Sequence, residues 1–191
     1  ALGPGECYVP AGWSRSGGDP AIGVAPLPPR SVWTDAYVIS RFAVTNREYI
    51  AFLDDLAAPG RDHPAPAYAP RERGGTAGKD GAMIYGRDPR GHFVLRPDAD
   101  GDVWQPDWPV VMVTWACAVE YARWLSERTG QAWRLPGELE WERAARGADG
   151  RFFPWGDHID PSWCCVRDSH PGRRESTPVD GFKEDEISLG A

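Results

Sequence analysis

The chain has 191 residues, of which 41% are hydrophobic and 26% charged, which allows one sizeable core and excludes disorder of the whole chain. Its 28 acidic and 21 basic side chains give a net charge of −7. This balance argues against nucleic acid as a partner, because proteins that bind nucleic acids contact the phosphates with clustered Lys and Arg side chains. No apolar run reaches the roughly 18 residues that a membrane-spanning helix needs, so we expect no membrane partner.

The counts of Cys, Gly, Pro and Trp narrow the class of protein further. Four cysteines are too few for a disulfide scaffold in a chain of this length, so we expect a cytoplasmic protein. The 22 Gly and 19 Pro, with little helical periodicity, predict many loops, and the 10 Trp predict aromatic anchors that hold those loops.

The N-terminal part of the chain predicts strands. Residues 6–13 (ECYVPAGW) indicate a short strand that runs into a turn, and a Gly/Pro-rich loop follows over residues 14–30. Residues 32–42 (VWTDAYVISRF) are rich in β-branched and aromatic side chains, which favours another strand.

A helix is predicted to begin at Thr45. Its hydroxyl can accept the amide of Glu48, whose carboxylate can reach back to the Thr45 amide, so both residues receive a structural role as a capping box. Apolar residues follow at helical spacing, namely Tyr49, Phe52, Leu53 and Leu56. Pro59-Gly60 is predicted to end this helix.

Residues 60–106 are predicted to form a loop and hairpin insert. Within it, residues 82–85 and 92–96 indicate two strands joined by a turn. The acidic run 98–102 is similar to the first half of a calcium-binding loop, but Pro109 stands where such a loop needs Glu. We therefore favour an acidic turn between strands.

The next segment predicts a strand followed by a helix. Residues 109–113 are continuously apolar and indicate a buried strand, after which Thr114 is predicted to cap a helix over residues 115–128, with Gly130 just past its end. Apolar residues lie on both sides of this helix, which predicts burial over most of its circumference.

A further short strand and helix are predicted after that. Residues 133–135 indicate the strand, and Pro136 is placed at the first position of a helix that includes residues 137–146. Beyond it the chain is irregular to the end, without an internal repeat.

One face of that helix carries two carboxylates and an indole. Glu138, Trp141 and Glu142 share this face, and Arg134 precedes it. We expect all four to be structural, with the Arg134 guanidinium neutralising carboxylates that would otherwise repel each other; a functional charge cluster is the alternative.

Five blocks of sequence resemble the motifs of the formylglycine-generating enzyme (sulfatase-modifying factor) family. The longest spans residues 124–147 (WLSERTGQAWRLPGELEWERAARG) and is similar to the family's Arg-Leu-Pro-Thr-Glu and Glu-Trp-Glu hallmark. The others are residues 8–12 (YVPAG), 44–53 (VTNREYIAFL), 109–115 (PVVMVTW) and 153–157 (FPWGD). Their common order and spacing make the resemblance specific.

The resemblance implies an irregular, loop-rich α+β fold, related to C-type lectins, with few helices and short strands, as a single domain over residues 1–191. The insert and residues 151–157 look most like bacterial family members appended to serine/threonine kinases. A covalently linked kinase domain is therefore one expected partner. A second chain that completes the fold is another.

The departures from the family pattern concern its metal sites. Cys164-Cys165 stands where active members place calcium ligands, and Asp168 is the nearest carboxylate. Thiols are poor ligands for a hard cation, so we expect that calcium site to be absent. The sequence ends at Ala191, before the segment that holds the copper-binding Cys pair of active members, so the C-terminal active-site part is expected to be missing.

Cys164 and Cys165 are the candidate catalytic residues. Two thiolates would suit Cu(I), but adjacent side chains on an extended chain point in different directions. The favoured alternative is one buried and one exposed thiol.

Two further sets of candidates lie in the late loops. Candidate metal ligands are Asp157, Asp168 and His170, although loop side chains of these types are usually solvated. Trp155 and Trp163 are the candidate recognition surface if they are exposed, and anchoring in the core is favoured for Trp155.

Together these observations favour a non-catalytic module that binds a ligand or protein on the formylglycine-generating scaffold, as a sensor or accessory domain. We expect no cofactor in this chain. The alternative is a fragment of a copper-dependent oxidase that converts a protein cysteine to formylglycine, which would use copper and calcium.

Overall fold

The computed structural model describes residues 2–18, 27–58, 65–72, 81–98, 101–170, 172 and 176–183. They group into two compact units. Unit 1 comprises Ala1–Phe42, Pro136–Glu175 and Asp180–Ala191, and unit 2 comprises Ala43–Leu135 and Ser176–Val179. None of the helices in these described stretches has the length and apolar character to span a bilayer.

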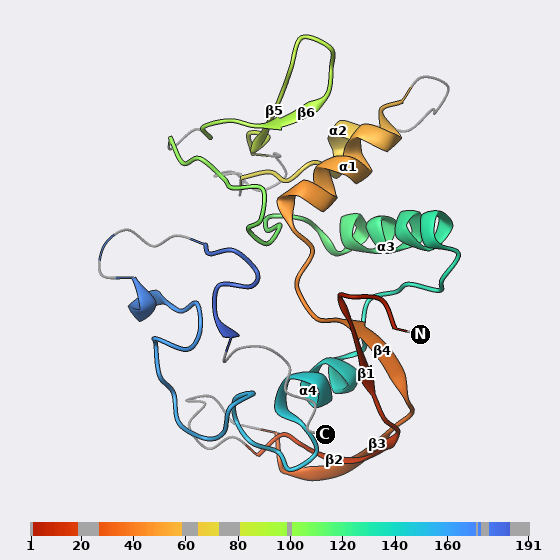
Figure 1. Ribbon diagram of the computed structural model, residues 1–191, viewed down its shortest axis with the longest axis vertical. Coiled ribbons are helices and arrows are strands. Elements are labelled where there is room, and N and C mark those ends of the chain that lie inside the picture. Colours follow the sequence, from red (N-terminus) through yellow and green to blue (C-terminus); the bar gives the residue numbers. More distant parts are fainter. Residues whose placement is uncertain are drawn as a thin grey trace. The chain divides into compact units, whose positions relative to one another are not determined.

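Unit 1 is built on a long antiparallel ribbon (Figure 1). Strand β1 (Glu6–Val9) pairs with β4 (Tyr37–Ser40), and β2 (Gly12–Ser16) pairs with β3 (Arg30–Thr34). The register is continuous, because Val9 lies opposite Tyr37 and Gly12 lies opposite Thr34. The two predicted strand regions therefore exist, and each is interrupted once. The loop predicted over residues 14–30 is wrong at its ends, because β2 continues to Ser16 and β3 begins at Arg30.

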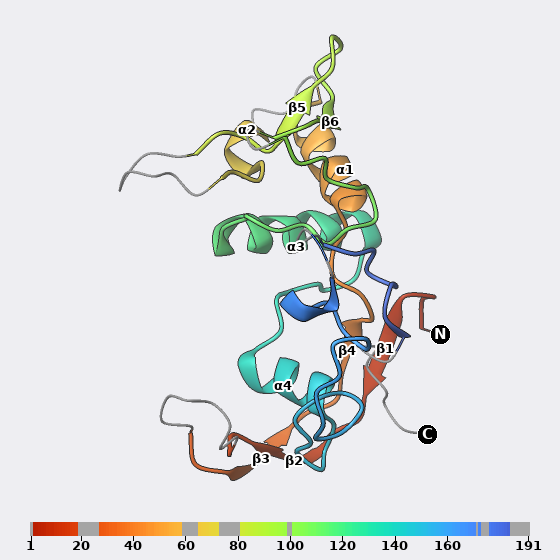
Figure 2. The same cartoon turned by 90° about the vertical axis from the view of Figure 1, so that its left-hand side faces the viewer.

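Helix α4 (Glu138–Arg146) packs against β2 and β3 (Figure 2). Gly137 is its N-cap, and the Glu140 carboxylate accepts the Gly137 amide at 2.6 Å. The expectation that Pro136 occupies the first helical position is wrong, because Pro136 precedes the cap. A short 3-10 turn, η1 (Arg167–Ser169), is the remaining helical element of the described part of unit 1.

Unit 2 contains helices α1 (Asn46–Leu56), α2 (Ala65–Tyr68) and α3 (Trp115–Thr129), together with the hairpin of β5 (Tyr85–Arg87) and β6 (Phe93–Leu95). The predicted capping box is confirmed, since the Glu48 amide donates to Thr45 Oγ1 and the Thr45 amide donates to Glu48 Oε2. Thr114 and Gly130 cap α3 as predicted.

The core of unit 2 is aromatic. Tyr49 and Phe52 of α1 contact Tyr121 of α3 with ring centroids 5.6 Å apart in both pairs, and Phe52 also meets Trp124 edge to face at 5.5 Å. The Tyr85 hydroxyl donates to buried Asn46 at 2.5 Å. These contacts join both main helices and the hairpin in one apolar cluster.

Several expectations for unit 2 are wrong. Residues 109–113 form no strand, although Pro109 makes an isolated bridge to Thr45 and the Val110 amide donates to the Val44 carbonyl, and residues 133–135 form no strand either. Nor is α3 buried over most of its circumference, because Trp115 is 75% exposed. Apolar runs this short do not by themselves distinguish a strand from an extended loop that lies on a core.

Candidate functional site

Two indoles stand side by side on the outer face of the unit 1 ribbon. Trp13 of β2 lies directly opposite Trp33 of β3, and their rings meet edge to face with centroids 5.7 Å apart. They are 64% and 51% exposed, and the Trp33 indole N–H donates to Asp35 at 3.0 Å. Paired aromatic rings that remain this exposed are typical of recognition surfaces.

The inner side of the ribbon is held by Arg143 of α4. This buried guanidinium donates to the carbonyl of Pro10 at 2.7 Å and to the carbonyl of Gly12, at the junction between β1 and β2. Gly12 leaves room for it, since a Cβ there would lie 3.1 Å from the Arg143 Nη2 atom. The strand that carries Trp13 is thereby fixed to α4.

Glu142, the neighbour of Arg143, fixes the end of β2. Its carboxylate accepts the amide of Gly17 at 3.1 Å and pairs with Arg146 one helical turn on. Burial on its own raises the pKa of Glu142, but hydrogen bonds from Ser16 and Gly17 and the pairing with Arg146 outweigh it, so the pKa is lowered. Glu142 thus contacts the end of β2 and Arg146, and the structural role expected for it remains a prediction.

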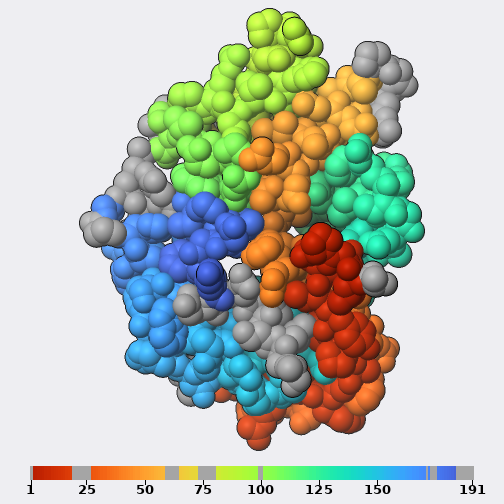
Figure 3. Space-filling view, viewed as in Figure 1, coloured from red at the N-terminus to blue at the C-terminus, as the bar shows by residue number. Residues whose placement is uncertain are grey.

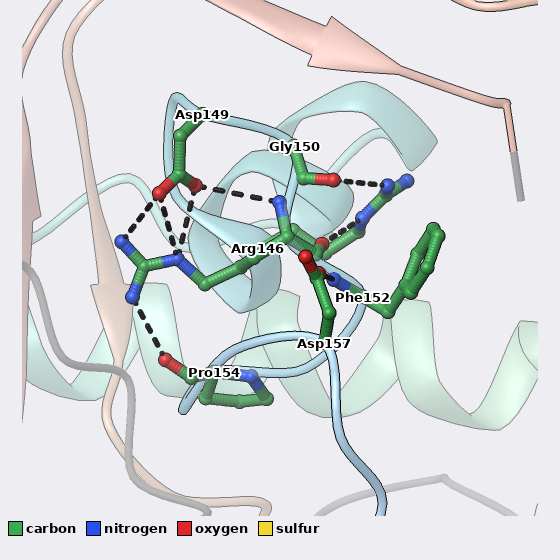
Figure 4. Close-up of polar contacts among 7 residues, drawn as sticks. Arg146, Asp149, Gly150, Phe152, Pro154 and Asp157 are labelled. Atoms are coloured by element: carbon green, nitrogen blue, oxygen red, sulfur yellow. Dashed lines mark hydrogen bonds and ion pairs between the residues drawn. The ribbon is translucent and has the colours of Figure 1, made fainter.

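The loop after α4 is organised by two guanidinium groups (Figure 4). Arg146 donates to the carbonyls of Arg151 at 2.6 Å and Gly150 at 2.8 Å. The Arg151 side chain pairs with Asp149 through two nitrogens and donates to the carbonyl of Pro154 at 3.0 Å. The loop following α4, light blue in Figure 3, is therefore a fixed surface of unit 1.

Asp157, a predicted metal ligand, makes a hydrogen bond within this loop. Its Oδ1 atom accepts the amide of Phe152 at 2.9 Å (Figure 4). The tight turn that precedes it is closed by reciprocal backbone bonds between Phe153 and Gly156, at 2.8 and 3.1 Å. The same turn carries Trp155, one of the two indoles of the predicted recognition surface.

Trp155 and Trp163 lie together, as members of one aromatic row. Phe153 stacks on Trp155 at 5.3 Å with an interplanar angle of 5°, and Trp163 meets Trp155 edge to face at 6.0 Å. The Trp155 indole N–H donates to the carbonyl of His158 at 2.7 Å. All three residues are half-buried, so this row both anchors the loop and remains partly accessible to solvent.

The two adjacent cysteines have different surroundings. Cys164 is buried and its sulfur lies 3.8 Å from the Asp160 carbonyl oxygen, whereas Cys165 is exposed and its sulfur lies 3.6 Å from Nε2 of His170. The expectation of one buried and one exposed thiol is confirmed. The structure also brings together two candidates, Cys165 and His170, that the sequence analysis had assigned to separate sites.

The described residues do not fit copper or calcium. No group of three or more His, Cys, Asp or Glu side chains converges within them. The two thiols face different partners, and the second carboxylate candidate, Asp168, is exposed within η1. We therefore derive no chemistry through a metal from this part of the chain.

The remaining structural candidates lie at the surface. Trp141 is 61% exposed, whereas the side chains that α4 buries are Arg143 and Ala144, so the structural role expected for this indole remains a prediction. Glu138 is exposed in the first turn of α4. Arg134 is exposed and donates to the carbonyl of Leu135 at 3.1 Å, and its neutralising role remains a prediction.

The sequence analysis missed the pair of Trp13 and Trp33. Their pairing depends on a register that spans the loop between β2 and β3, and that register cannot be read from either segment alone. No signal within either strand announces the pairing, because it follows from the register that places Val9 opposite Tyr37 and Trp13 opposite Trp33.

Comparison with known proteins places this geometry in a family. The model of the sulfatase-modifying factor enzyme 1-like domain matches residues 2–189. A formylglycine-generating enzyme of Thermomonospora curvata is 32% identical over an alignment of 180 residues, which covers 82% of this chain and 54% of the relative. The chain thus spans about half the length of that relative.

Two further proteins are similar over less sequence or at lower identity. The serine/threonine-protein kinase Pkn1 of Chlamydia trachomatis is 28% identical over 137 residues, covering 71% of this chain and 19% of the kinase. The solved structure of PvdO from Pseudomonas aeruginosa superposes with a TM-score of 0.64 at 24% identity, over 93% of this chain and 62% of that one. The predicted α+β fold is confirmed by this likeness.

Proposed function

Because the chain belongs to the sulfatase-modifying factor enzyme 1-like family, we propose that it is a binding module on that scaffold, which recognises a protein ligand through the exposed indoles of unit 1. The exposed pair of Trp13 and Trp33 carries the proposal. Such a module would act as a sensor or accessory domain of a larger protein, for example one that includes a kinase.

A polypeptide ligand suits this surface for two reasons. The indoles lie on a ribbon held from behind by Arg143, so little ordering entropy is lost when a ligand binds. Next to them, Arg15 and Ser31 lie opposite each other and are exposed, which adds hydrogen-bond donors beside the rings. Aromatic rings flanked by Arg are typical of the centres of protein interfaces.

The test is panning of a displayed peptide library on the wild-type chain and on the Trp13→Ala/Trp33→Ala double variant. Truncating a central indole usually costs at least 2 kcal/mol, so we expect recovery of selected peptides to fall by at least about tenfold. The matched control is Ile159→Ala, since Ile159 is another exposed apolar side chain of unit 1, 51% exposed. Equal recovery on the double variant, with its circular dichroism unchanged, would refute the proposed surface.

A second candidate function is a copper-dependent oxidase that converts a protein cysteine to formylglycine, with this chain as one part of the enzyme. The name of the Thermomonospora curvata relative favours it. The chain would be incubated with Cu(I), oxygen and a cysteine peptide from a sulfatase, and the aldehyde product sought by mass spectrometry. The binding-module proposal expects no conversion. Conversion by the chain would replace that proposal with the oxidase.

A further inference from the structure

Cys165 and His170 form a thiol–imidazole pair in the loops of unit 1. The sulfur lies 3.6 Å from Nε2, within the range over which a thiol can donate its proton to an imidazole nitrogen. Cys165 is the one exposed thiol among the four cysteines, all of which lie in the described residues: Cys117 and Cys164 are buried and Cys7 is half-buried.

The pair is positioned by Ser169. Its hydroxyl accepts the Val166 amide at 2.9 Å and donates to the carbonyl of Cys164, and its own amide donates to the Val166 carbonyl at 3.0 Å. One serine therefore closes the short turn between the cysteine and the histidine. The approach of the two side chains follows from this fixed backbone rather than from a long flexible loop.

Cys117 is a buried cysteine and serves as a comparison for Cys165. It lies in the first turn of α3, buried, and its sulfur contacts the hydroxyl of the N-cap residue Thr114 at 3.1 Å. Buried thiols of this kind are inert, whereas an exposed thiol beside a base is the arrangement in which cysteine is nucleophilic. Of the two, only Cys165 has that arrangement.

We propose that Cys165 and His170 are a nucleophilic pair that takes up a small-molecule disulfide as a reversible mixed disulfide. The imidazole accepts the thiol proton, and the resulting thiolate attacks one sulfur of the disulfide. A bond forms between Cys165 and that sulfur as the original S–S bond breaks. The second half leaves as a thiolate and takes the proton from the imidazolium. One thiol and one disulfide are consumed, and one mixed disulfide and one small-molecule thiol are formed.

The test uses oxidised glutathione on the intact chain near neutral pH, with each cysteine-containing peptide quantified by mass spectrometry over time. We expect Cys165 to be modified first, and its rate to fall by at least about tenfold in His170→Ala, since a positioned base usually contributes at least that much. Cys165→Ser should abolish modification of that peptide and leave the other cysteines unchanged.

The matched control is His158→Ala, which removes an exposed imidazole from the same unit. Its Cys165 should react within about twofold of the wild-type rate, as expected for a side chain outside the pair. Near-equal rates in wild type and His170→Ala, or faster modification of Cys7, would overturn the proposal. If His170→Ala loses its native circular dichroism, His170→Gln gives the same comparison. The result does not depend on the proposed role of Trp13 and Trp33.

Discussion

The two units are stabilised by different kinds of contact between their side chains and backbone. Unit 2 buries a contiguous group of aromatic and aliphatic side chains around Phe52, whereas the buried positions of unit 1 include Ser14, Ser16, Thr34 and Arg143. In unit 2 the large rings pack on one another. In unit 1 arginine side chains hold backbone carbonyls, as Arg143 does at the junction of the ribbon.

This difference decides where recognition chemistry can be placed. Hydrophobic packing buries most of the aromatic side chains of α1 and α3, although Trp115 at the start of α3 stays exposed, and these rings stabilise the fold because they are buried. Hydrogen bonds from guanidinium groups to carbonyls hold loops without using apolar side chains. Unit 1 can therefore present Trp13 and Trp33 at its surface and still keep its ribbon in place.

The largest expected effect is on the packed core of unit 2. Phe52 is fully buried and touches the rings of Tyr49, Tyr68, Tyr121 and Trp124. Phe52→Ala should cost about 3–5 kcal/mol of unfolding free energy, because it removes apolar burial and leaves a cavity. Urea denaturation gives the total, and hydrogen exchange should rise first in peptides of α1 and α3.

Its control is Val119→Ala on the exposed side of α3, where 37% of the valine is accessible. This change should cost less than about 1 kcal/mol. A similar loss for both variants would mean that the ring contacts around Phe52 contribute little, and the contrast between the two units would then be lost.

The next effect tests the polar clamp of unit 1, by which we mean the hydrogen bonds from Arg143 to the carbonyls of Pro10 and Gly12. Arg143→Met keeps much of the side-chain volume but removes these donors, so we expect the free energy of unfolding to fall by about 2–3 kcal/mol. Exchange should rise first in peptides of β1 and β2. Arg143→Lys keeps the charge but lacks the planar guanidinium, so its free energy of unfolding should lie between those of wild type and Arg143→Met.

A surface arginine provides the comparison for that loss. Arg123 pairs with Glu120 and Glu127 on α3 but is exposed, and Arg123→Met should cost at most about 0.5 kcal/mol. If Arg143→Met is equally mild, or its exchange rises in unit 2 instead, the clamp does not hold the ribbon.

Unit 2 was the more predictable half. The capping box of Thr45 and Glu48, the cap at Thr114 and the stop at Gly130 are local signals, each readable within a few residues. The strands expected at residues 109–113 and 133–135 and the wide burial expected for α3 were wrong, because a short apolar run does not by itself show which elements will pack on it or pair with it.

In unit 1 the decisive contacts join residues far apart in the chain. Arg143 and Gly12 are separated by 131 positions, and no local pattern announces their contact. Trp141 was expected to be structural, yet α4 turns Arg143 and Ala144 inward and leaves the indole exposed. The split of Cys164 and Cys165 into a buried and an exposed thiol was predictable, because adjacent side chains of an extended segment diverge; the closeness of His170 was not.

The smallest effect, and the one specific to a polar interior, concerns pH. The pKa of Glu142 is lowered in the folded state, where Ser16, Gly17 and Arg146 hold its carboxylate despite its burial. Such a group stabilises the fold above its unfolded pKa, about 4.3 for Glu, and that contribution disappears as pH falls through the lower folded value. Glu142→Gln should therefore lower the melting temperature at pH 7 and flatten its decline below about pH 4.3, where wild type loses the contribution. If the melting temperatures of both proteins changed in parallel from neutral to acid pH, the ionised carboxylate of Glu142 would contribute no stability. The contacts of Arg143 and Arg146 with backbone carbonyls would then hold unit 1 without it.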